Sequence, residues 1–197
     1  RTPEGRKVKS LAFVQCVGSR NRRFQPNCSG YCCTASIKEA MLALEHAPEA
    51  EVSIFYNDIR TAGKGFEELY QRAAKAGVRF IKGIPAAIHP EMESGRPCLV
   101  YDDMINGGQR KHAVDLVVLA VGMEPKEDRL PWQEGLKPER DSYGFYQEYH
   151  LLLHPLEASV PGVYLLGTCR GPKDIAESVA DASGVAAKIA AQFARGA

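Results

Sequence analysis

The first half of the chain alternates short apolar runs with longer segments that carry apolar residues at helical spacing. Apolar runs at 11–16, 52–56 and 78–81 have the length and content of buried strands. Segment 34–45 places apolar side chains three and four positions apart, which predicts a helix, and a second helix is predicted over 66–76. Strands that alternate with helices imply a parallel sheet, so we expect an α/β fold.

The middle of the chain changes to shorter strands and turns. A strand is predicted at 98–101, and the Asn-Gly-Gly sequence at 106–108 is a strong hairpin turn after it. The apolar run 113–121 predicts a further strand, which stops at a Gly-Met-Glu-Pro sequence. We therefore predict a domain boundary here, with residues 1–123 and 124–197 as the two parts.

The last third begins with a polar, proline-rich stretch and ends in a long helix. The apolar run 163–167 predicts a buried strand, and a tight loop, 168–173, follows it. Asp174 is a good N-cap for a helix that runs to about Phe193. Small residues line this helix. They would let an anion or a ring approach its amino terminus, and they would equally permit close packing of the helix on a sheet.

Length and charge set wide limits on the function. The 197 residues are enough for one large domain or two small ones, and 25 Lys and Arg nearly balance 24 Asp and Glu. This balance gives no indication of nucleic-acid binding, and no apolar run is long enough to span a bilayer. The chain begins at Arg1 without a methionine and has no visible targeting segment, so we expect a cytoplasmic protein and a piece of a longer polypeptide.

Four of the six cysteines lie close together near the start of the chain. Cys16, Cys28, Cys32 and Cys33 have the spacing C-x11-C-x3-C-C. Four cysteine thiolates are the ligand set of an all-cysteine iron–sulfur cluster. Cys32 and Cys33 fall in the first turn of the helix predicted after them, where backbone N–H groups and the helix dipole favour a thiolate.

Three other roles are open to these cysteines, although their spacing favours a cluster. Neighbouring helical residues point about 100° apart, which suits a cluster with several iron atoms better than one tetrahedral metal. Structural zinc is usually held by two separated C-x2-4-C pairs, a form that neither half of this pattern has. Adjacent cysteines rarely pair, and no secretory signal precedes them. Zinc, a disulfide and ordinary buried thiols therefore stay open as alternatives. Cys98 and Cys169 are expected to be small buried residues.

Five sequence segments resemble those of one protein family. They are FVQCVGSR at 13–20, CSGYCC at 28–33 with Ile37 and Lys38, IFYNDIR at 54–60, GKGFEE at 63–68 and GTCRGPKDI at 167–175. They resemble the HdrA flavoproteins of heterodisulfide reductase and their relatives in sulfur metabolism. The likeness runs over nearly the whole chain, and the cysteine block is its most specific part.

The resemblance implies a three-layer FAD/NAD(P)-binding fold of the thioredoxin-reductase type. In that family a domain built like a nicotinamide-binding one interrupts the FAD domain. Residues 1–123 would be this inserted domain, with a [4Fe–4S] cluster on the four clustered cysteines, and 124–197 the C-terminal half of the FAD domain. No G-x-G-x-x-G sequence follows a strand in these residues. The N-terminal half of the FAD domain is therefore expected in the same polypeptide or in another chain.

The loop after the first strand departs from a nicotinamide-binding loop. Such a loop carries G-x-G-x-x-G so that a pyrophosphate can approach the helix. Here residues 16–21 contain one glycine, Gly18, and the expected ligand Cys16. We therefore predict that this domain does not bind NAD(P)H.

The resemblance also places FAD against the loop before the last helix. The expected contacts are Gly167, Thr168, Lys173, Asp174 and Ile175, at a helix amino terminus that stabilises negative charge on the reduced ring. Thr168 stands where related flavoproteins have an aspartate for the ribityl chain.

Lys38 is the candidate catalytic residue. The resemblance implies that it faces the flavin from the cluster-bearing helix, where a cation favours the reduced state. A solvated lysine on an amphipathic helix is the alternative.

The predicted function is that of an oxidoreductase subunit that transfers electrons between FAD and a [4Fe–4S] cluster. A flavin exchanges two electrons and a cluster one, so the pair connects hydride-level chemistry to single-electron carriers. The resemblance implies a complex with other iron–sulfur subunits, a hydrogenase or formate dehydrogenase as electron source, and a disulfide or ferredoxin as acceptor, with electron bifurcation among its functions. Two alternatives are kept: a cluster-only electron relay or scaffold without its own flavin, and a zinc-stabilised, non-catalytic binding module.

Overall fold

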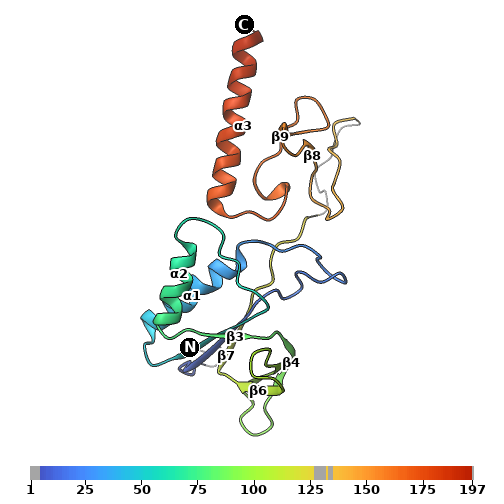
Figure 1. Cartoon of the computed structure of the whole chain (residues 1–197). Coiled ribbons are helices and arrows are strands. Elements are labelled where there is room, and N and C mark those ends of the chain that lie inside the picture. The colour runs from blue at the N-terminus through green and yellow to red at the C-terminus, as the bar shows by residue number, and fades with distance from the viewer. Residues whose placement is uncertain (1–4, 127–131, 133–134, 197) are drawn as a thin grey trace. The chain divides into compact units, whose positions relative to one another are not determined.

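The protein divides into two compact units. The computed structural model describes residues 5–126, 132 and 135–196 (Figure 1). The first unit contains the residues up to 18 together with 31–121, and the second contains 19–30 together with the residues from 122 onward. The second stretch of the second unit begins at Gly122, and residues 19–30 belong to the same unit. The assignment of 1–123 and 124–197 to two different domains stays a prediction.

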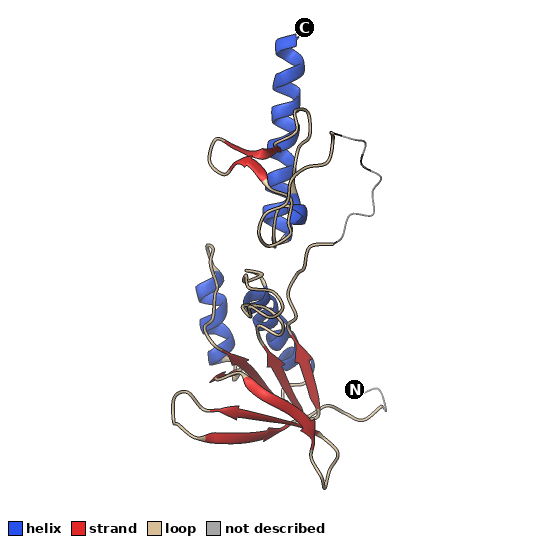
Figure 2. Ribbon diagram, turned by 90° about the vertical axis from the view of Figure 1, so that its right-hand side faces the viewer, coloured by secondary structure: helices blue, strands red, loops and turns tan. Residues whose placement is uncertain are grey.

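A parallel sheet of four strands forms the centre of the first unit (Figure 2). Its order is β3-β2-β1-β7, and β1 pairs in parallel with both β2 and β7. The strands are β1 (Ser10–Val14), β2 (Glu51–Tyr56), β3 (Arg79–Lys82) and β7 (Leu116–Leu119). The parallel sheet expected from the alternation of strands and helices is therefore confirmed.

Two layers cover the faces of this sheet. Side chains alternate between the faces along a strand, so Leu11 and Phe13 pack with Ile37 and other residues of the helices, while Ala12 and Val14 pack on the opposite side. The helical layer is α1 (Cys32–His46) and α2 (Phe66–Lys75). The opposite layer is an antiparallel sheet of β4 (Pro85–Pro90), β5 (Pro97–Asp102) and β6 (Gln109–Ala113). The first unit is thus built of three layers.

The strand predicted over 113–121 is wrong as a single element. Ala113 is the last residue of β6, and the chain then passes into β7 of the other sheet. Asp115 lies between the two strands, and its carboxylate accepts hydrogen bonds from the backbone N–H groups of Lys9 at 2.7 Å and Ser10 at 3.0 Å. This anchor fixes the chain at the start of β1 and divides the apolar run between two sheets.

The described residues of the second unit form one short hairpin and one long helix. Its elements are β8 (Glu148–His150), β9 (His154–Ala158), the 3-10 turn η1 (Gly167–Cys169) and α3 (Ile175–Gly196). The expected N-cap is confirmed, because the Asp174 carboxylate accepts from the Glu177 N–H at 2.8 Å and the Glu177 carboxylate accepts from the Asp174 N–H at 2.9 Å. None of the helices in the described residues has the length and apolar content needed to cross a membrane.

The strand predicted over 163–167 is also wrong. This segment forms a single bridge between Tyr164 and Glu157, and Gly167 already belongs to η1. A buried parallel strand needs a hydrogen-bonding neighbour on each side. Within the described residues the segment has β9 alone as a neighbour, through hydrogen bonds such as that from Leu165 N to Leu156 O at 2.9 Å.

Candidate functional site

The loop that follows β1 turns sharply at its first cysteine. Cys16 has φ 58°, a left-handed conformation that is uncommon for a residue with a side chain, and Arg20 has φ 57°. The loop is closed by a hydrogen bond from Arg20 N to Asn27 O at 3.1 Å. Such conformations persist where the surrounding structure determines them, and they concentrate at ligand sites.

A close approach fixes the far side of the same loop. Gly122 has φ +82°, and a Cβ atom at this position would lie 2.4 Å from Ser29 Oγ and 2.5 Å from Ser19 Oγ. The Ser29 hydroxyl accepts a hydrogen bond from Met123 N at 2.9 Å. Ser19 and Ser29, which lie near the two ends of the segment 19–30, are therefore held against Gly122. Any other residue at position 122 would have to displace these two hydroxyl groups.

Cys32 and Cys33 are the first two residues of α1, as the sequence predicted. Cys33 is buried, and its Sγ lies 4.0 Å from the carbonyl oxygen of Asp58. Partial burial raises the pKa of the preceding Tyr31 above its ordinary value, and the charge and hydrogen bonding of Cys32 raise it further. The Tyr31 hydroxyl therefore stays protonated beside the sulfur of Cys32.

Cys28 also has a hydrogen-bond donor of its own. The backbone N–H of Gly30 points to Cys28 Sγ at 3.3 Å. No disulfide bond joins any of the six cysteines, so the disulfide alternative finds no support. Cys98 is buried as expected, whereas Cys169 is only partly buried, with its Sγ 3.1 Å from Leu166 O.

The four cysteine side chains are not arranged in this structure with the geometry that one metal ion requires. Across the part of the chain that the structure describes, no group of three or more His, Cys, Asp or Glu side chains is arranged to hold a metal ion. The ligand set Cys16, Cys28, Cys32 and Cys33 therefore stays a prediction.

Two buried amide nitrogens, Gln15 Nε2 and Gln25 Nε2, have no hydrogen-bond partner, and each is a suitable donor to an anionic sulfur atom. Gln15 is fully buried, and neither its Nε2 nor its Oε1 atom has a hydrogen-bond partner. Gln25 Nε2 and Asn27 Oδ1 are buried and unpaired as well. An unsatisfied buried polar group costs about 1–3 kcal/mol, so natural proteins rarely keep one without a ligand or water. Amide N–H groups beside thiols are suitable donors to cluster sulfur.

The loop expected to contact FAD is organised by one carboxylate. Asp181 of α3 accepts from Gly167 N at 3.1 Å and from Arg170 Nη1 at 3.1 Å, and it forms an ion pair with Lys173 Nζ at 3.3 Å. The three side chains are between 10% and 21% exposed. Burial by itself would raise the pKa of Asp181, but the Gly167 N–H and the two cations outweigh it, so the pKa is lowered and Asp181 is an anion.

The expected flavin contacts differ in their surroundings. Gly167 is buried with φ +63°, and Lys173 joins it through Asp181. Asp174 caps α3, whereas Thr168 is exposed and the Ile175 side chain is 84% exposed. The structure thus brings the backbone of Gly167 and the side chain of Lys173 together, and it leaves Thr168 and Ile175 at the surface.

Asp181 is a residue that the sequence analysis missed. The sequence does contain a feature that could have indicated this residue. Asp181 is an acidic residue two turns after the N-cap, and the loop before the helix contains two cations. Lys38, the candidate catalytic residue, is exposed on α1, and its role stays a prediction.

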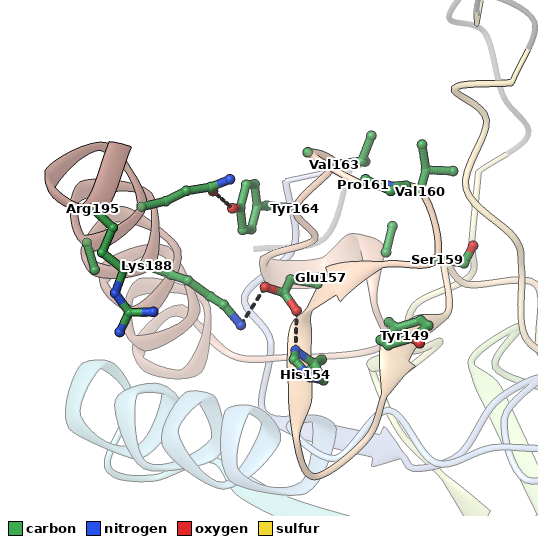
Figure 3. A pocket seen from close by; sticks show the side chains of 14 residues that line it. Tyr149, His154, Glu157, Ser159, Val160, Pro161, Val163, Tyr164, Lys188 and Arg195 are labelled. Carbon is green, nitrogen blue, oxygen red and sulfur yellow. Dashed lines mark hydrogen bonds and ion pairs between the residues drawn. The ribbon is translucent and has the colours of Figure 1, made fainter. Parts of the chain in front are cut away.

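The second unit also contains a pocket of about 700 Å³ between β9 and the second half of α3 (Figure 3). Glu157 lies between two partners, Lys188 Nζ at 2.6 Å and the ring of His154. Hydrogen bonding to Lys188 is the main cause that lowers the Glu157 pKa. Lys188 lies 13 residues after Ile175, which is about 20 Å along a helix, so this pocket is separate from the loop 167–173. The sequence analysis named none of these residues.

Among the curated proteins that are similar to the whole chain are two subunits of heterodisulfide reductases. One is an HdrA-type iron–sulfur subunit of the CoB–CoM heterodisulfide reductase of Methanopyrus kandleri, which is 42% identical over 100% of this chain and 30% of that protein. The other is the HdrA-type subunit of the H2/formate:CoB–CoM heterodisulfide,ferredoxin reductase of Methanococcus maripaludis, which is 39% identical, also over 100% of this chain and 30% of that protein. The chain therefore spans about 30% of the length of these relatives. No protein-family model matches it.

A solved structure shows the fold to which the chain corresponds. The thioredoxin reductase of Lactococcus lactis is 18% identical and superposes with a TM-score of 0.57, over 89% of this chain and 50% of that one. At this identity the likeness concerns the fold alone. It confirms the predicted three-layer FAD/NAD(P)-binding fold of the thioredoxin-reductase type, of which the chain is a part.

Proposed function

The chain belongs to the HdrA family of heterodisulfide reductase subunits, and on this basis we propose that it is the part of such an oxidoreductase subunit that carries electrons between FAD and a [4Fe–4S] cluster. One observation carries the proposal: cysteines occupy the loop after β1 and the first turn of α1. In a dinucleotide-binding domain this is the place of the phosphate-binding loop.

Cys16, Cys28, Cys32 and Cys33 would hold the cluster, which when bound stores and releases one electron at a time. The Gly30 N–H donates to Cys28 Sγ, and Cys32 and Cys33 lie at the positive end of the α1 dipole. Positive charge along the loop is also high, since three arginines lie between the first two cysteines. These are Arg20, Arg22 and Arg23. Together these features offset the negative charge of an all-thiolate site.

FAD would lie against Gly167, Thr168, Lys173, Asp174 and Ile175, and when bound it exchanges electrons in pairs. The buried, left-handed Gly167 lets a ring approach the backbone closely, and the amino terminus of α3 favours negative charge there. Lys38 is proposed as the cation that stabilises the reduced flavin.

A further polypeptide segment is expected to cover the second unit. Ile175, Val179 and Phe193 of α3 are 84%, 59% and 76% exposed, at positions that follow one another along one side of a helix. Segment 163–167 has a strand-like sequence with β9 as its neighbour on one side. We assign both surfaces to the N-terminal half of the FAD domain, in the same chain or in another.

The partners follow from the names of the relatives, which include H2, formate, a heterodisulfide and ferredoxin. We propose that the protein works in a complex with other iron–sulfur subunits, with hydrogenase or formate dehydrogenase as electron source and a disulfide or ferredoxin as acceptor. Electron bifurcation is the most specific form of this proposal. Six cysteines without a disulfide bond among them fit a reducing compartment, so we place the complex in the cytoplasm.

Metal analysis of the anaerobically reconstituted chain tests the cluster. We expect brown protein with equal amounts of iron and acid-labile sulfide, and at least a fivefold loss of both in Cys33→Ser. The matched control is Cys98→Ala, a buried cysteine of β5 outside the ligand set, which should keep its iron. Colourless protein that binds zinc would support the non-catalytic binding module and overturn the proposal.

Flavin content of the complete assembly tests the second half of the proposal. Denaturation of the purified complex should release FAD in proportion to the amount of this polypeptide. A complex that contains the cluster but releases no flavin would support the alternative of a cluster-only relay.

A further inference from the structure

Gln15 is the residue immediately before the first predicted cluster ligand, and we propose that its side-chain amide donates an N–H···S hydrogen bond to the cluster and thereby raises its reduction potential. This inference rests on the proposed function, because it requires a cluster on the four cysteines. It assigns to Gln15 a positioning and tuning role, without direct ligation.

The backbone of Gln15 is fixed by the central sheet. Its N–H donates to Phe55 O at 3.0 Å, which extends the pairing of β1 with β2 by one residue. Leu11 and Phe13 pack on the face of the sheet that α1 and α2 cover. Side chains two residues apart share a face, so the Gln15 side chain lies on this face too.

The face that holds Gln15 is the one covered by the cluster-bearing helix. Ile37, one turn after Cys33, is fully buried in the same core as Phe13. A hydrocarbon side chain would be the ordinary occupant of such a position. Gln15 instead places an amide with two N–H donors there, at 0% exposure and without a partner for either its nitrogen or its oxygen.

An anionic acceptor explains this residue better than a neutral one. The position lies next to Cys16, and a thiolate-ligated cluster offers several sulfur atoms that accept hydrogen bonds. N–H donors to these sulfurs stabilise the more negative, reduced form and so raise the reduction potential. The buried Nε2 donor of Gln15 would then be costly without the cluster and would have an acceptor with it.

The experiment compares wild type with Gln15→Leu and with Gln15→Met, which nearly keeps the length of the side chain. The potential of the reconstituted cluster is measured by redox titration monitored by EPR, on the complete chain. We expect both variants to load iron and sulfide and to shift the reduction equilibrium about tenfold toward the oxidised form, which for one electron is about 59 mV lower. Resonance Raman bands of the Fe–S stretches should lose part of their shift in deuterated water.

Ser53→Ala is the matched control. Ser53 is a buried polar residue of the neighbouring strand β2, but its hydroxyl already contacts Leu11 O at 3.4 Å and His112 Nε2 at 3.2 Å. Its removal perturbs the same sheet and should leave the potential and the Raman bands unchanged.

A second readout uses the chain before iron is added. If the amide is unpaired without the cluster, Gln15→Leu and Gln15→Met unfold at the same denaturant concentration as wild type or at a higher one. A marked loss of stability in both variants of the iron-free chain would reveal another partner for the amide and overturn the inference. An unchanged potential in the loaded variants would overturn it as well. Absence of iron and sulfide from wild type would instead overturn the proposed function, and the inference with it.

Discussion

Individual residues decide the chemistry on both sides of the proposed electron path. In the loop proposed to contact FAD, one carboxylate, Asp181, joins the backbone of Gly167 to the side chains of Arg170 and Lys173. A loop with two cations and no counter-charge would repel itself in a partly buried setting. Asp181 removes this repulsion and determines where the ammonium group of Lys173 lies.

We expect Asp181→Asn to loosen the loop without unfolding the unit. The amide keeps an acceptor for Gly167 N–H but loses the charge that holds the two cations, so the cost is about 1–3 kcal/mol of stability. Trypsin should cut after Arg170 or Lys173 several times faster than in wild type, and the Gly167 amide should exchange its hydrogen faster. Asp102→Asn, which changes an exposed carboxylate of β5, is the control. Unchanged cleavage and exchange in Asp181→Asn would show that Asp181 does not organise the loop.

Elements meet across the layers of the first unit through a small number of polar contacts. His112 of β6 crosses to the central sheet, where its Nε2 lies 3.2 Å from Ser53 Oγ of β2. Burial, with a further contribution from Arg79, lowers the His112 pKa below its ordinary value of 6.5. The folded protein therefore favours the neutral imidazole at this contact between the two layers.

The pH dependence of stability follows from this shift. As pH falls below about 6.5, His112 takes up a proton more readily in the unfolded chain than in the folded one. The contribution of His112 to the free energy of unfolding is therefore present above that pH and is lost below it. Denaturant unfolding at pH 7.5 and pH 5.5 should show a smaller loss of stability at the lower pH for His112→Gln than for wild type. Equal losses in the two proteins would contradict the assignment.

At the scale of the whole molecule, the two units differ in the apolar surface that they bury. The first unit has two clusters of buried side chains, one on each face of its central sheet. In the described residues of the second unit, the buried apolar side chains are Phe145, Ala158, Leu165 and Val185. Burial of apolar area is the main favourable term in folding, so the second unit should be the less stable one.

The single tryptophan reports on this difference. Trp132 belongs to the second unit, with its ring centroid 6.0 Å from that of Tyr146. We expect far-UV circular dichroism to change in two steps as denaturant is added, and the fluorescence change of Trp132 to coincide with the first. When the N-terminal half of the FAD domain is added, the midpoint of this first transition should move to a higher denaturant concentration. One coincident transition would contradict the difference in stability.

Local signals in the sequence determined the elements whose formation depends on neighbouring residues. The helix around Ile37, the Asn-Gly-Gly hairpin turn and the Asp174 cap formed as predicted, because periodicity, turn geometry and capping act within a few residues. The cysteine spacing and the family segments are equally visible in the sequence, and they indicate the family without any knowledge of the fold.

Tertiary structure alone decided the features that depend on distant partners. The run 113–121 was divided because Asp115 accepts hydrogen bonds from Lys9 and Ser10, more than a hundred residues away in the chain. Segment 163–167 failed to become a strand because a strand requires neighbours, and sequence periodicity does not supply them. The role of Asp181 and the unpaired amide of Gln15 emerged in the same way, since burial and hydrogen bonding across the fold are properties of the packed chain.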